Sequence, residues 1–143
     1  MDRIHVTEYF LRMAELVALR GTCARRRVGC VLVDRHNHVL ATGYNGAPQG
    51  QPHCIDMPCP GAAHPSGQGL SDCRAVHAEQ NALLQCHDVQ AILTVYCTAS
   101  PCITCMRMLA NTGVRSIVFR ELYPHPEAEE LARTAHIGWI HVP

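Results

Sequence analysis

The stretch that decides the fold is AILTVYCTASPCITCMRMLANTGVRSIVF, residues 91–119. Its first part, AILTVYCT at 91–98, is apolar and rich in β-branched residues, which predicts a buried strand. CITCMRMLANTG at 102–113 predicts a helix, with a proline at its start and a glycine at its end. VRSIVF at 114–119 predicts a second buried strand. A strand–helix–strand unit of this length indicates two parallel strands covered by a helix.

The flanking segments extend this alternation on both sides. A helix is predicted before the unit, AVHAEQNALLQ at 75–85, and another after it, PEAEELARTAH at 126–136. IGWIHV at 137–142 then predicts a last strand. Alternating helices and strands indicate helices packed on a sheet that contains parallel strand pairs.

The N-terminal third predicts an antiparallel addition to this sheet. Apolar residues at helical spacing predict a helix over 7–20, which Thr7 would cap. VGCVLV at 28–33 and HVLATG at 38–43 are separated by the turn DRHN, so they predict a hairpin. No repeat, linker or second domain is visible. We therefore expect one α/β domain over residues 1–143, with a mixed sheet of about five strands flanked by helices.

Composition argues against several classes of protein. Lys plus Arg and Asp plus Glu number 12 each, so the formal net charge is zero, and aromatic residues make up 5% of the chain. A generic nucleic-acid binder carries a basic excess, so we expect no nucleic-acid partner. No apolar run approaches the roughly 20 residues of a membrane span, and the first ten residues lack a signal-peptide pattern. We therefore expect a cytoplasmic protein that does not bind a membrane.

The chain changes character in the loop over 46–76. This loop is rich in Gly, Pro, His and Cys and shows no periodicity, and such a long structureless loop is unusual inside a small domain. The whole chain holds nine cysteines and ten histidines. Without a secretion signal, clustered Cys and His indicate metal ligands rather than disulfides. We expect a bound metal to organise this loop.

Four residues form a candidate catalytic centre: His77, Glu79, Cys102 and Cys105. The two cysteines are three residues apart in the first turn of a predicted helix, so they share a face, and the helix dipole favours their thiolates. Two thiolates and a neutral imidazole leave the fourth tetrahedral position of a zinc ion open for water, as in catalytic zinc sites. Because two thiolates offset the charge of zinc, a base must accept a proton from that water, and Glu79 is placed to do so.

Each motif alone has a plainer interpretation, but the combination is specific. A Cys-x-x-Cys pair also occurs in redox and structural zinc sites, and His-x-Glu is common by chance. His-x-Glu followed by Pro-Cys-x-x-Cys is the signature of zinc-dependent nucleobase deaminases. The chain resembles the deoxycytidylate (dCMP) deaminases in four segments: TCARRRVGCVLV (22–33), ATGYNGAPQG (41–50), VHAEQNAL (76–83) and CTASPCITC (97–105).

The resemblance implies a fold, a reaction and three substrate contacts. The fold would be the three-layer α/β/α cytidine-deaminase-like fold, and the reaction the hydrolysis of dCMP to dUMP and ammonia, which supplies dUMP for thymidylate synthesis. Water activated by zinc would attack C4 of the pyrimidine while Glu79 moves the protons. Carried over by position, Asn45 would hydrogen-bond the sugar, the backbone around Ala78 would read the base, and Tyr123 would close over the nucleotide.

The 5′-phosphate is expected to meet the arginine run that follows the first helix. The resemblance places Arg25 on the phosphate, with Arg26 and Arg27 as alternatives, and an arginine suits this role because its guanidinium is planar and permanently charged. The run could equally be a solvated group of charges. Asn45, in the sequence GYNG, could be only a turn residue, since Asn-Gly favours turns.

A second candidate zinc site consists of four cysteines outside the catalytic pair: Cys23, Cys54, Cys59 and Cys73. Some members of the resembling family hold a second zinc between the end of the first helix and this loop. Four thiolates would make a closed structural site, and His53 or His64 could replace one of them. The three remaining cysteines, at 30, 86 and 97, lie in apolar contexts that predict core packing.

Other functions remain open. A deaminase of cytidine, dCTP or a modified dCMP would keep these motifs and differ where phosphate binds. A nucleic-acid editing deaminase would need a basic channel and stacking aromatics, and a non-catalytic zinc-binding protein would not need Glu79.

The resemblance also implies an oligomer and a regulatory ligand. Many of the resembling enzymes are homohexamers that dCTP activates and dTTP inhibits, with Mg²⁺ accompanying the triphosphate. We expect the helix that carries Met106, Met108 and Leu109 to offer apolar surface to a partner copy; the alternative for the two methionines is a place in the core.

Overall fold

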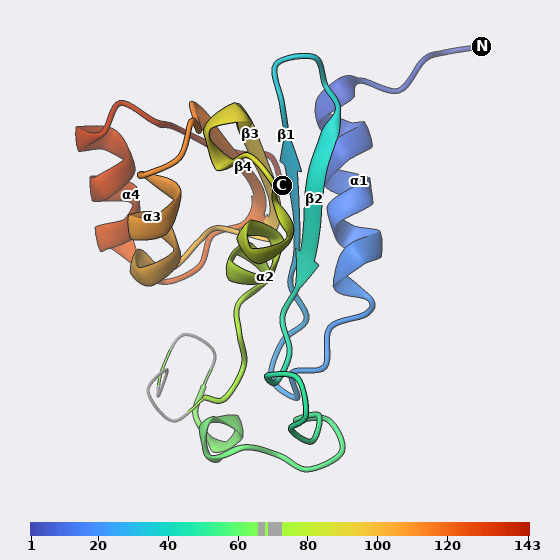
Figure 1. The fold of residues 1–143 in the computed structure, drawn as a ribbon, viewed down its shortest axis with the longest axis vertical. Coiled ribbons are helices and arrows are strands. Elements are labelled where there is room, and N and C mark those ends of the chain that lie inside the picture. Colours follow the sequence, from blue (N-terminus) through green and yellow to red (C-terminus); the bar gives the residue numbers. More distant parts are fainter. Residues whose placement is uncertain (66–67, 69–72) are drawn as a thin grey trace.

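The computed structural model describes residues 1–65, 68 and 73–143 (Figure 1), so part of the predicted 46–76 loop lies outside the described residues. In chain order the elements are α1 (Val6–Ala18), β1 (Gly29–Val33), β2 (Val39–Tyr44), the 3-10 helix η1 (Pro60–Ala63), α2 (Ala78–Gln85), the 3-10 helix η3 (Val89–Ala91), β3 (Thr94–Ala99), α3 (Ile103–Leu109), β4 (Ser116–Glu121), α4 (Pro126–Thr134) and β5 (Gly138–His141). Among these described helices, none has both the length and the hydropathy to span a membrane.

The strands form one mixed sheet of five in the order β2-β1-β3-β4-β5. β1 is antiparallel to both β2 and β3, whereas β3, β4 and β5 run parallel to one another. The hairpin and the parallel strand–helix–strand unit predicted from the sequence are therefore confirmed. The hairpin joins the parallel part through β1 and β3.

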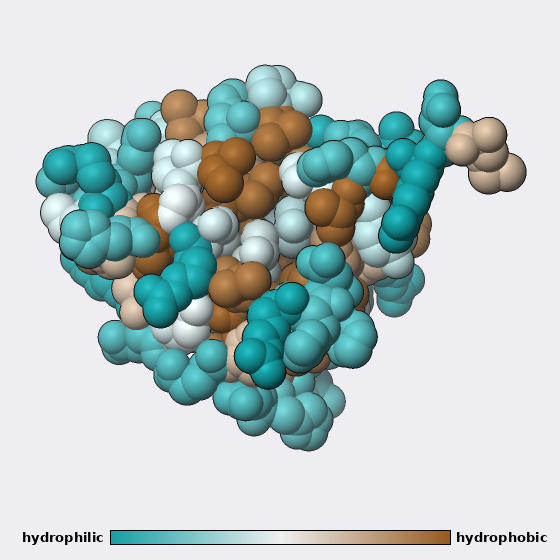
Figure 2. Space-filling model, turned by 90° about the horizontal axis from the view of Figure 1, so that it is seen from above, coloured by the Kyte–Doolittle hydropathy of each residue, from teal (hydrophilic) through white to brown (hydrophobic). Residues whose placement is uncertain are grey.

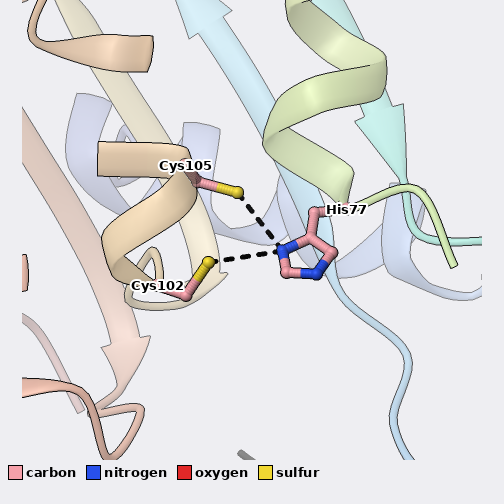
Figure 3. Close-up of side chains that lie close together, drawn as sticks. All are labelled: His77, Cys102 and Cys105. Atoms are coloured by element: carbon pink, nitrogen blue, oxygen red, sulfur yellow. Dashed lines mark hydrogen bonds between the residues drawn. The ribbon is translucent and has the colours of Figure 1, made fainter. Parts of the chain in front are cut away.

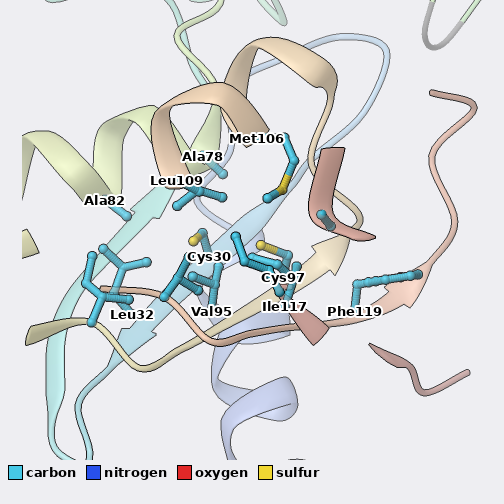
Figure 4. Packing of buried hydrophobic residues seen from close by; sticks show 14 of the residues in the cluster. Cys30, Leu32, Ala78, Ala82, Val95, Cys97, Met106, Leu109, Ile117 and Phe119 are labelled. Carbon is cyan, nitrogen blue, oxygen red and sulfur yellow. The ribbon is translucent and has the colours of Figure 1, made fainter. Parts of the chain in front are cut away.

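Helices cover both faces of the sheet. α1 lies on one face, and α2, α3 and α4 lie on the other, so the molecule has three layers (Figure 1). The side chains of successive residues of β1 point to opposite faces of the sheet. Val31 and Val33 pack with Phe10 of α1, whereas Cys30 and Leu32 belong to the larger cluster under the other three helices (Figure 4). The three-layer α/β/α fold expected from the resemblance is confirmed.

Element boundaries differ from the sequence prediction where tertiary contacts decide them. The helix predicted from residue 75 begins at Ala78, because Val76 exchanges two backbone hydrogen bonds with Gly46 and His77 stays extended as the N-cap. The first helix begins at Val6 rather than Thr7, since the His5 side chain accepts a hydrogen bond from the Thr7 N–H.

The predicted apolar contact surface on α3 is largely absent. Met106 and Leu109 are completely buried in the core that α3 and α4 share with the sheet, and only Met108 is partly exposed. That prediction was therefore wrong for two of its three residues.

Close backbone contacts fix α2 against the sheet. A Cβ atom on Gly43 of β2 would lie 2.3 Å from the Ala78 carbonyl oxygen and 2.4 Å from the Ala82 nitrogen. Only glycine permits this approach, so the start of α2 is held directly over the hairpin. His77 and Glu79 take their positions from that contact.

Candidate active site

Two helix starts bring the predicted ligands together. His77 is the N-cap of α2 and Cys102 is the N-cap of α3, which follows directly from the end of β3. Cys105 lies one turn into α3 and points, with Cys102, at the imidazole of His77 (Figure 3). The His77 Nδ1 atom is 3.5 Å from the Cys102 Sγ atom and 3.3 Å from the Cys105 Sγ atom.

These distances fit a tetrahedral zinc ion. Bonds of about 2.3 Å to sulfur and 2.0–2.1 Å to nitrogen would place the sulfur and nitrogen atoms about 3.6 Å apart. The three ligand atoms all lie within 4.8 Å of one another, and this is the only such group of three among the described residues. Three protein ligands of the zinc-preferring types leave one position for a water molecule, as in catalytic zinc sites.

The charges of the site also call for a cation. A hydrogen bond from Cys105, with help from His77, lowers the pKa of Cys102 to about 3 despite its burial. The same contact with Cys102, together with burial and the nearby Glu79, raises the pKa of Cys105. Two thiolates and a carboxylate this close together, away from water, cannot all ionise unless a metal ion compensates them.

Glu79 occupies the second residue of α2 and is 4% exposed. Burial raises the pKa of its carboxyl, and the charge of His77 and a hydrogen bond with Cys105 act in the opposite direction. The side chain at position 80 fixes this helix start, since the Gln80 Oε1 atom accepts a hydrogen bond from the His77 N–H at 2.8 Å. A buried carboxyl with a raised pKa beside a metal site has the properties of a general acid and base.

A cleft of about 590 Å³, part of it open to solvent, lies in front of this group. All four residues with predicted substrate contacts line it: Arg25, Asn45, Ala78 and Tyr123. The cleft lies beyond the carboxyl end of β3, where ligands bind in open α/β sheets.

Arg25, Arg26 and Asn45 are already engaged within the protein. The Arg25 Nη1 atom donates to backbone carbonyls of the loop, and the Arg26 guanidinium forms an ion pair with Glu121 and lies 5.3 Å from the centre of the Tyr123 ring. Arg27 is exposed and is absent from the lining of this cleft.

Asn45 holds the wall of the cleft in place. Its Oδ1 atom accepts from the Val28 N–H, and its Nδ2 atom donates to the Arg26 carbonyl, both at 2.8 Å. Each amide atom still has capacity for a second hydrogen bond.

Sequence reasoning missed Ser100. This residue is 3% exposed, lines the cleft, and its Oγ atom accepts from the Tyr123 N–H at 2.7 Å. It therefore fixes the segment that carries Tyr123 next to the start of α3. The signal for it was its place directly before Pro-Cys-x-x-Cys, at the end of a predicted strand.

The second group of cysteines is brought together in part. The Sγ atoms of Cys54 and Cys59 are 3.6 Å apart. Burial opposes ionisation of Cys59, but hydrogen bonds from backbone groups and from Cys54 lower its pKa to about 7. Burial raises the pKa of Cys73, which interacts electrostatically with Cys23 and Cys59. Cys23 and Cys73 also line the cleft, so this group adjoins the candidate active site.

The other three cysteines lie in or beside the core. Cys30 and Cys97 are completely buried and face each other across β1 and β3, and Cys86 packs against the core while partly exposed. All nine cysteines are free thiols.

Comparison with known proteins gives a consistent result. A family model described as the cytidine and deoxycytidylate deaminase zinc-binding region matches residues 4–121. The chain is 40% identical over 126 residues to the deoxycytidylate deaminase of Mycobacterium phage D29, covering 83% of this chain and 97% of that one. It is 43% identical over 119 residues to the deoxycytidylate deaminase of Schizosaccharomyces pombe, covering 80% of this chain but only 37% of that relative.

A solved structure shows the same architecture. The dCMP deaminase from the cyanophage S-TIM5, in apo form, superimposes with a TM-score of 0.76 at 25% identity, covering 99% of this chain and 100% of that one. The family model spans Glu79 and the three predicted zinc ligands. The positions of the ligand atoms fit zinc without reference to any relative. The chain therefore belongs to the cytidine and deoxycytidylate deaminase family.

Proposed function

We propose that this protein hydrolyses dCMP to dUMP and ammonia. The observation that supports this most directly is the buried Glu79 carboxyl beside the His77, Cys102 and Cys105 ligand set, in a cleft that two arginines also line. The relatives at 40% identity or more are named deoxycytidylate deaminases.

In the proposed reaction His77, Cys102 and Cys105 hold zinc, which supplies Lewis-acid activation of water when bound. Glu79 takes a proton from the attacking water and delivers it to N3 of the pyrimidine. It then takes the second proton from the oxygen that is now bonded to C4 and delivers it to the amine, which leaves as ammonia while the C4 carbonyl forms. Burial of Glu79 keeps its pKa above the ordinary value, which favours the return of the proton. The backbone at Ala78, at the first residue of α2, lies at the cleft and is proposed to read the base.

The sugar and phosphate are proposed to occupy the outer part of the cleft. Asn45 retains hydrogen-bonding capacity for the sugar, and the Tyr123 ring lies over Arg26 at the rim. Arg25 and Arg26 both line the cleft, so a 5′-phosphate bound there would meet positive charge.

Other substrates would use the same centre and differ at the rim. A nucleoside such as cytidine has no phosphate for the arginines, and dCTP requires room for two further phosphates. A nucleic-acid substrate is disfavoured because the formal net charge is zero and aromatic residues make up 5% of the chain. A dCMP modified at C5 of the base would differ from dCMP in the space that it requires around that atom.

Ammonia release from dCMP, deoxycytidine, CMP and dCTP tests the proposed substrate. We expect kcat/KM to be highest for dCMP, and at least about tenfold lower for deoxycytidine, because one charge-assisted phosphate contact is lost. Equal activity on dCMP and deoxycytidine would contradict phosphate recognition. Preference for dCTP would keep the reaction and change the substrate.

We also propose a structural zinc held by Cys23, Cys54, Cys59 and Cys73. The close Cys54–Cys59 pair, the lowered pKa of Cys59 and the position of the loop between two fixed ends support this site. His53 and His64 remain alternative ligands. Metal analysis should give about two zinc ions per chain, and one zinc per chain in fully active protein would contradict the second site.

We further propose a cytoplasmic homo-oligomer, of hexameric size, with dCTP and dTTP as effectors and Mg²⁺ as their companion ion. Leu16 and Leu19 of α1 and Leu84 of α2 are well exposed, and apolar side chains also gather on the end of the molecule that bears the β1–β2 turn (Figure 2). Such surfaces favour self-association. Light scattering should give the mass of about six chains per particle. The dependence of the rate on dCMP concentration should be sigmoidal and should become hyperbolic when dCTP is added. A monomer whose kinetics neither dCTP nor dTTP changes would contradict this proposal.

A further inference from the structure

The Arg25 side chain makes an unusual concentration of backbone contacts. Its Nη1 atom lies 2.6 Å from the Gln68 carbonyl oxygen, 3.0 Å from that of Pro65 and 3.3 Å from that of His64. These three acceptors lie 39 to 43 residues away along the chain. Arg25 therefore joins the segment after α1 to the cysteine-rich loop. Its charged side chain donates hydrogen bonds to loop carbonyl groups that lie outside the helices and strands.

The loop that Arg25 holds forms part of the cleft. Its two ends are paired with each other through Gly46 and Val76, and η1 packs so tightly on its return that a Cβ atom on Gly61 would lie 2.7 Å from the Cys73 Cα atom. Cys73 and Ala75, on this return, line the cleft together with Arg25. A displacement of the loop would therefore change the shape of the cleft.

The same contacts make the Nη1 end of Arg25 a poor direct ligand for phosphate. An anion approaching Nη1 would have to displace three carbonyl oxygens, whose partial charges already offset part of the guanidinium charge. Arg26 faces a different situation. Its carboxylate partner, Glu121, has a side chain that is 70% exposed, whereas the Arg26 side chain is 22% exposed. The carboxylate can therefore turn into solvent and leave the guanidinium to a stronger anion.

We propose that Arg25 is a positioning residue: it binds the loop carbonyls of His64, Pro65 and Gln68 and holds the loop as a wall of the cleft, while Arg26 makes the phosphate contact. The phosphate contact of Arg26 rests on the proposed deamination of dCMP. The fixation of the loop by Arg25 is independent of any activity. It differs from the expectation by resemblance that Arg25 takes the phosphate.

Matched methionine variants test the assignment, because methionine keeps much of the apolar stem and removes the guanidinium. Arg25→Met, Arg26→Met and, as a control, Arg35→Met in the exposed β1–β2 turn would be compared with the native zinc-loaded protein. The first measurement is the rate of trypsin cleavage after Arg74, an exposed site on the loop. The second is kcat/KM for dCMP and for deoxycytidine.

Arg25→Met should increase the cleavage rate about tenfold, and should lower kcat/KM for both substrates by a similar factor. Arg26→Met should leave cleavage unchanged and lower kcat/KM at least about tenfold for dCMP alone. Arg35→Met should change neither. Arg25→Lys, which retains donors and charge, should restore part of the protection if Arg25→Met folds poorly.

Two results would overturn the proposal. One is an Arg25→Met protein with native cleavage rates, whatever its activity. The other is a loss confined to dCMP in Arg25→Met, which would make Arg25 the phosphate ligand. Failure of the native protein to deaminate either substrate would refute the proposed function, while the cleavage rates would still decide whether Arg25 holds the loop.

Discussion

His77 converges with Cys102 and Cys105, which lie 25 and 28 residues further along the chain, because helices α2 and α3 begin at the same place. Each helix start follows a segment whose course is fixed elsewhere: the Gly46–Val76 bridge for α2 and the end of β3 for α3. Glu79 then lies two residues beyond His77, at the second position of α2. Its burial follows from the packing of α2 on Gly43. The chemistry of the site is therefore a property of these two N-termini.

Loss of one thiolate should empty the metal site. Cys105→Ser replaces a soft ligand by a hydroxyl that stays protonated at neutral pH, so we expect the catalytic zinc and deaminase activity to be lost together. Zinc content per chain after dialysis and ammonia release from dCMP measure both.

Cys86→Ser is the matched control for this change. Cys86 is partly exposed at the end of α2 and lies outside the cleft, so its variant should keep zinc and turnover. Full zinc content in Cys105→Ser would contradict the assigned ligand set.

The residue types of the site could be predicted from the sequence, but their hydrogen bonds could not. The spacing of His77, Glu79 and the Cys-x-x-Cys pair specifies a zinc centre with a base. The engagement of Arg25 by carbonyls 39 to 43 residues away, and of Asn45 by the backbone at Arg26 and Val28, depends on the folded path of the loop. No local pattern in the sequence encodes those contacts.

At the scale of elements, the contact between α2 and β2 should be the most sensitive to added volume. Gly43→Ala would place a methyl group within 2.3 Å of the Ala78 carbonyl, so α2 must shift. We expect a loss of about 1–3 kcal/mol in the free energy of unfolding, and a fall in kcat because Glu79 moves with the helix. Denaturant unfolding and dCMP kinetics measure the two effects.

Gly138→Ala provides the comparison for this prediction. Its Cβ would lie 3.2 Å from the flexible Ser116 Oγ atom in β4, far from α2, so it should cost much less and leave kcat unchanged. Equal effects of the two alanines would show that the α2–β2 contact does not position Glu79.

The strands were easier to predict than the helix ends. Apolar, β-branched runs place β1, β2 and β4 within two residues of their observed bounds. The starts of α1 and α2 depend on the His5 cap and on the Gly46–Val76 bridge, which are contacts rather than patterns. The apolar residues of α3 were assigned to a partner surface because periodicity does not distinguish a buried face from an interface.

At the scale of the whole molecule, one arginine links the sheet to α1 and to the segment that follows β5. Arg120 of β4 donates to Glu8 and Glu15 of α1 at 2.6 and 2.7 Å, and to the Val142 carbonyl beyond β5. The hydrogen bond from Arg120 lowers the pKa of Glu8 below its ordinary value of about 4.5. The ionised carboxylate is thus favoured in the folded protein relative to the unfolded chain.

This linkage gives a defined dependence of stability on pH. Because the folded pKa of Glu8 is the lower one, its contribution is fully present above about pH 4.5 and is lost as pH falls through the folded value. The free energy of unfolding of Glu8→Gln should therefore fall below that of the native protein near pH 6, with the difference closing toward about pH 3. Urea unfolding across this range checks it.

Glu130→Gln is the control for the pH series, since Glu130 pairs only with Arg133 at the surface of α4 among the contacts described. Exposed helix pairs contribute little, so this variant should track the native protein at every pH. A Glu8→Gln difference that persists unchanged at low pH would refute the ion-pair explanation and indicate altered packing of α1.

The central claim is that Glu79 moves protons for a reaction at the zinc centre, and one measurement addresses it directly. Zinc content and dCMP turnover would be determined on the same preparation of Glu79→Gln, whose amide has nearly the same volume but cannot accept and return a proton. Full zinc content with turnover reduced by at least about 100-fold is the predicted result. Full zinc content with turnover within about threefold of the native protein would contradict the role of Glu79, because no general base would then be needed.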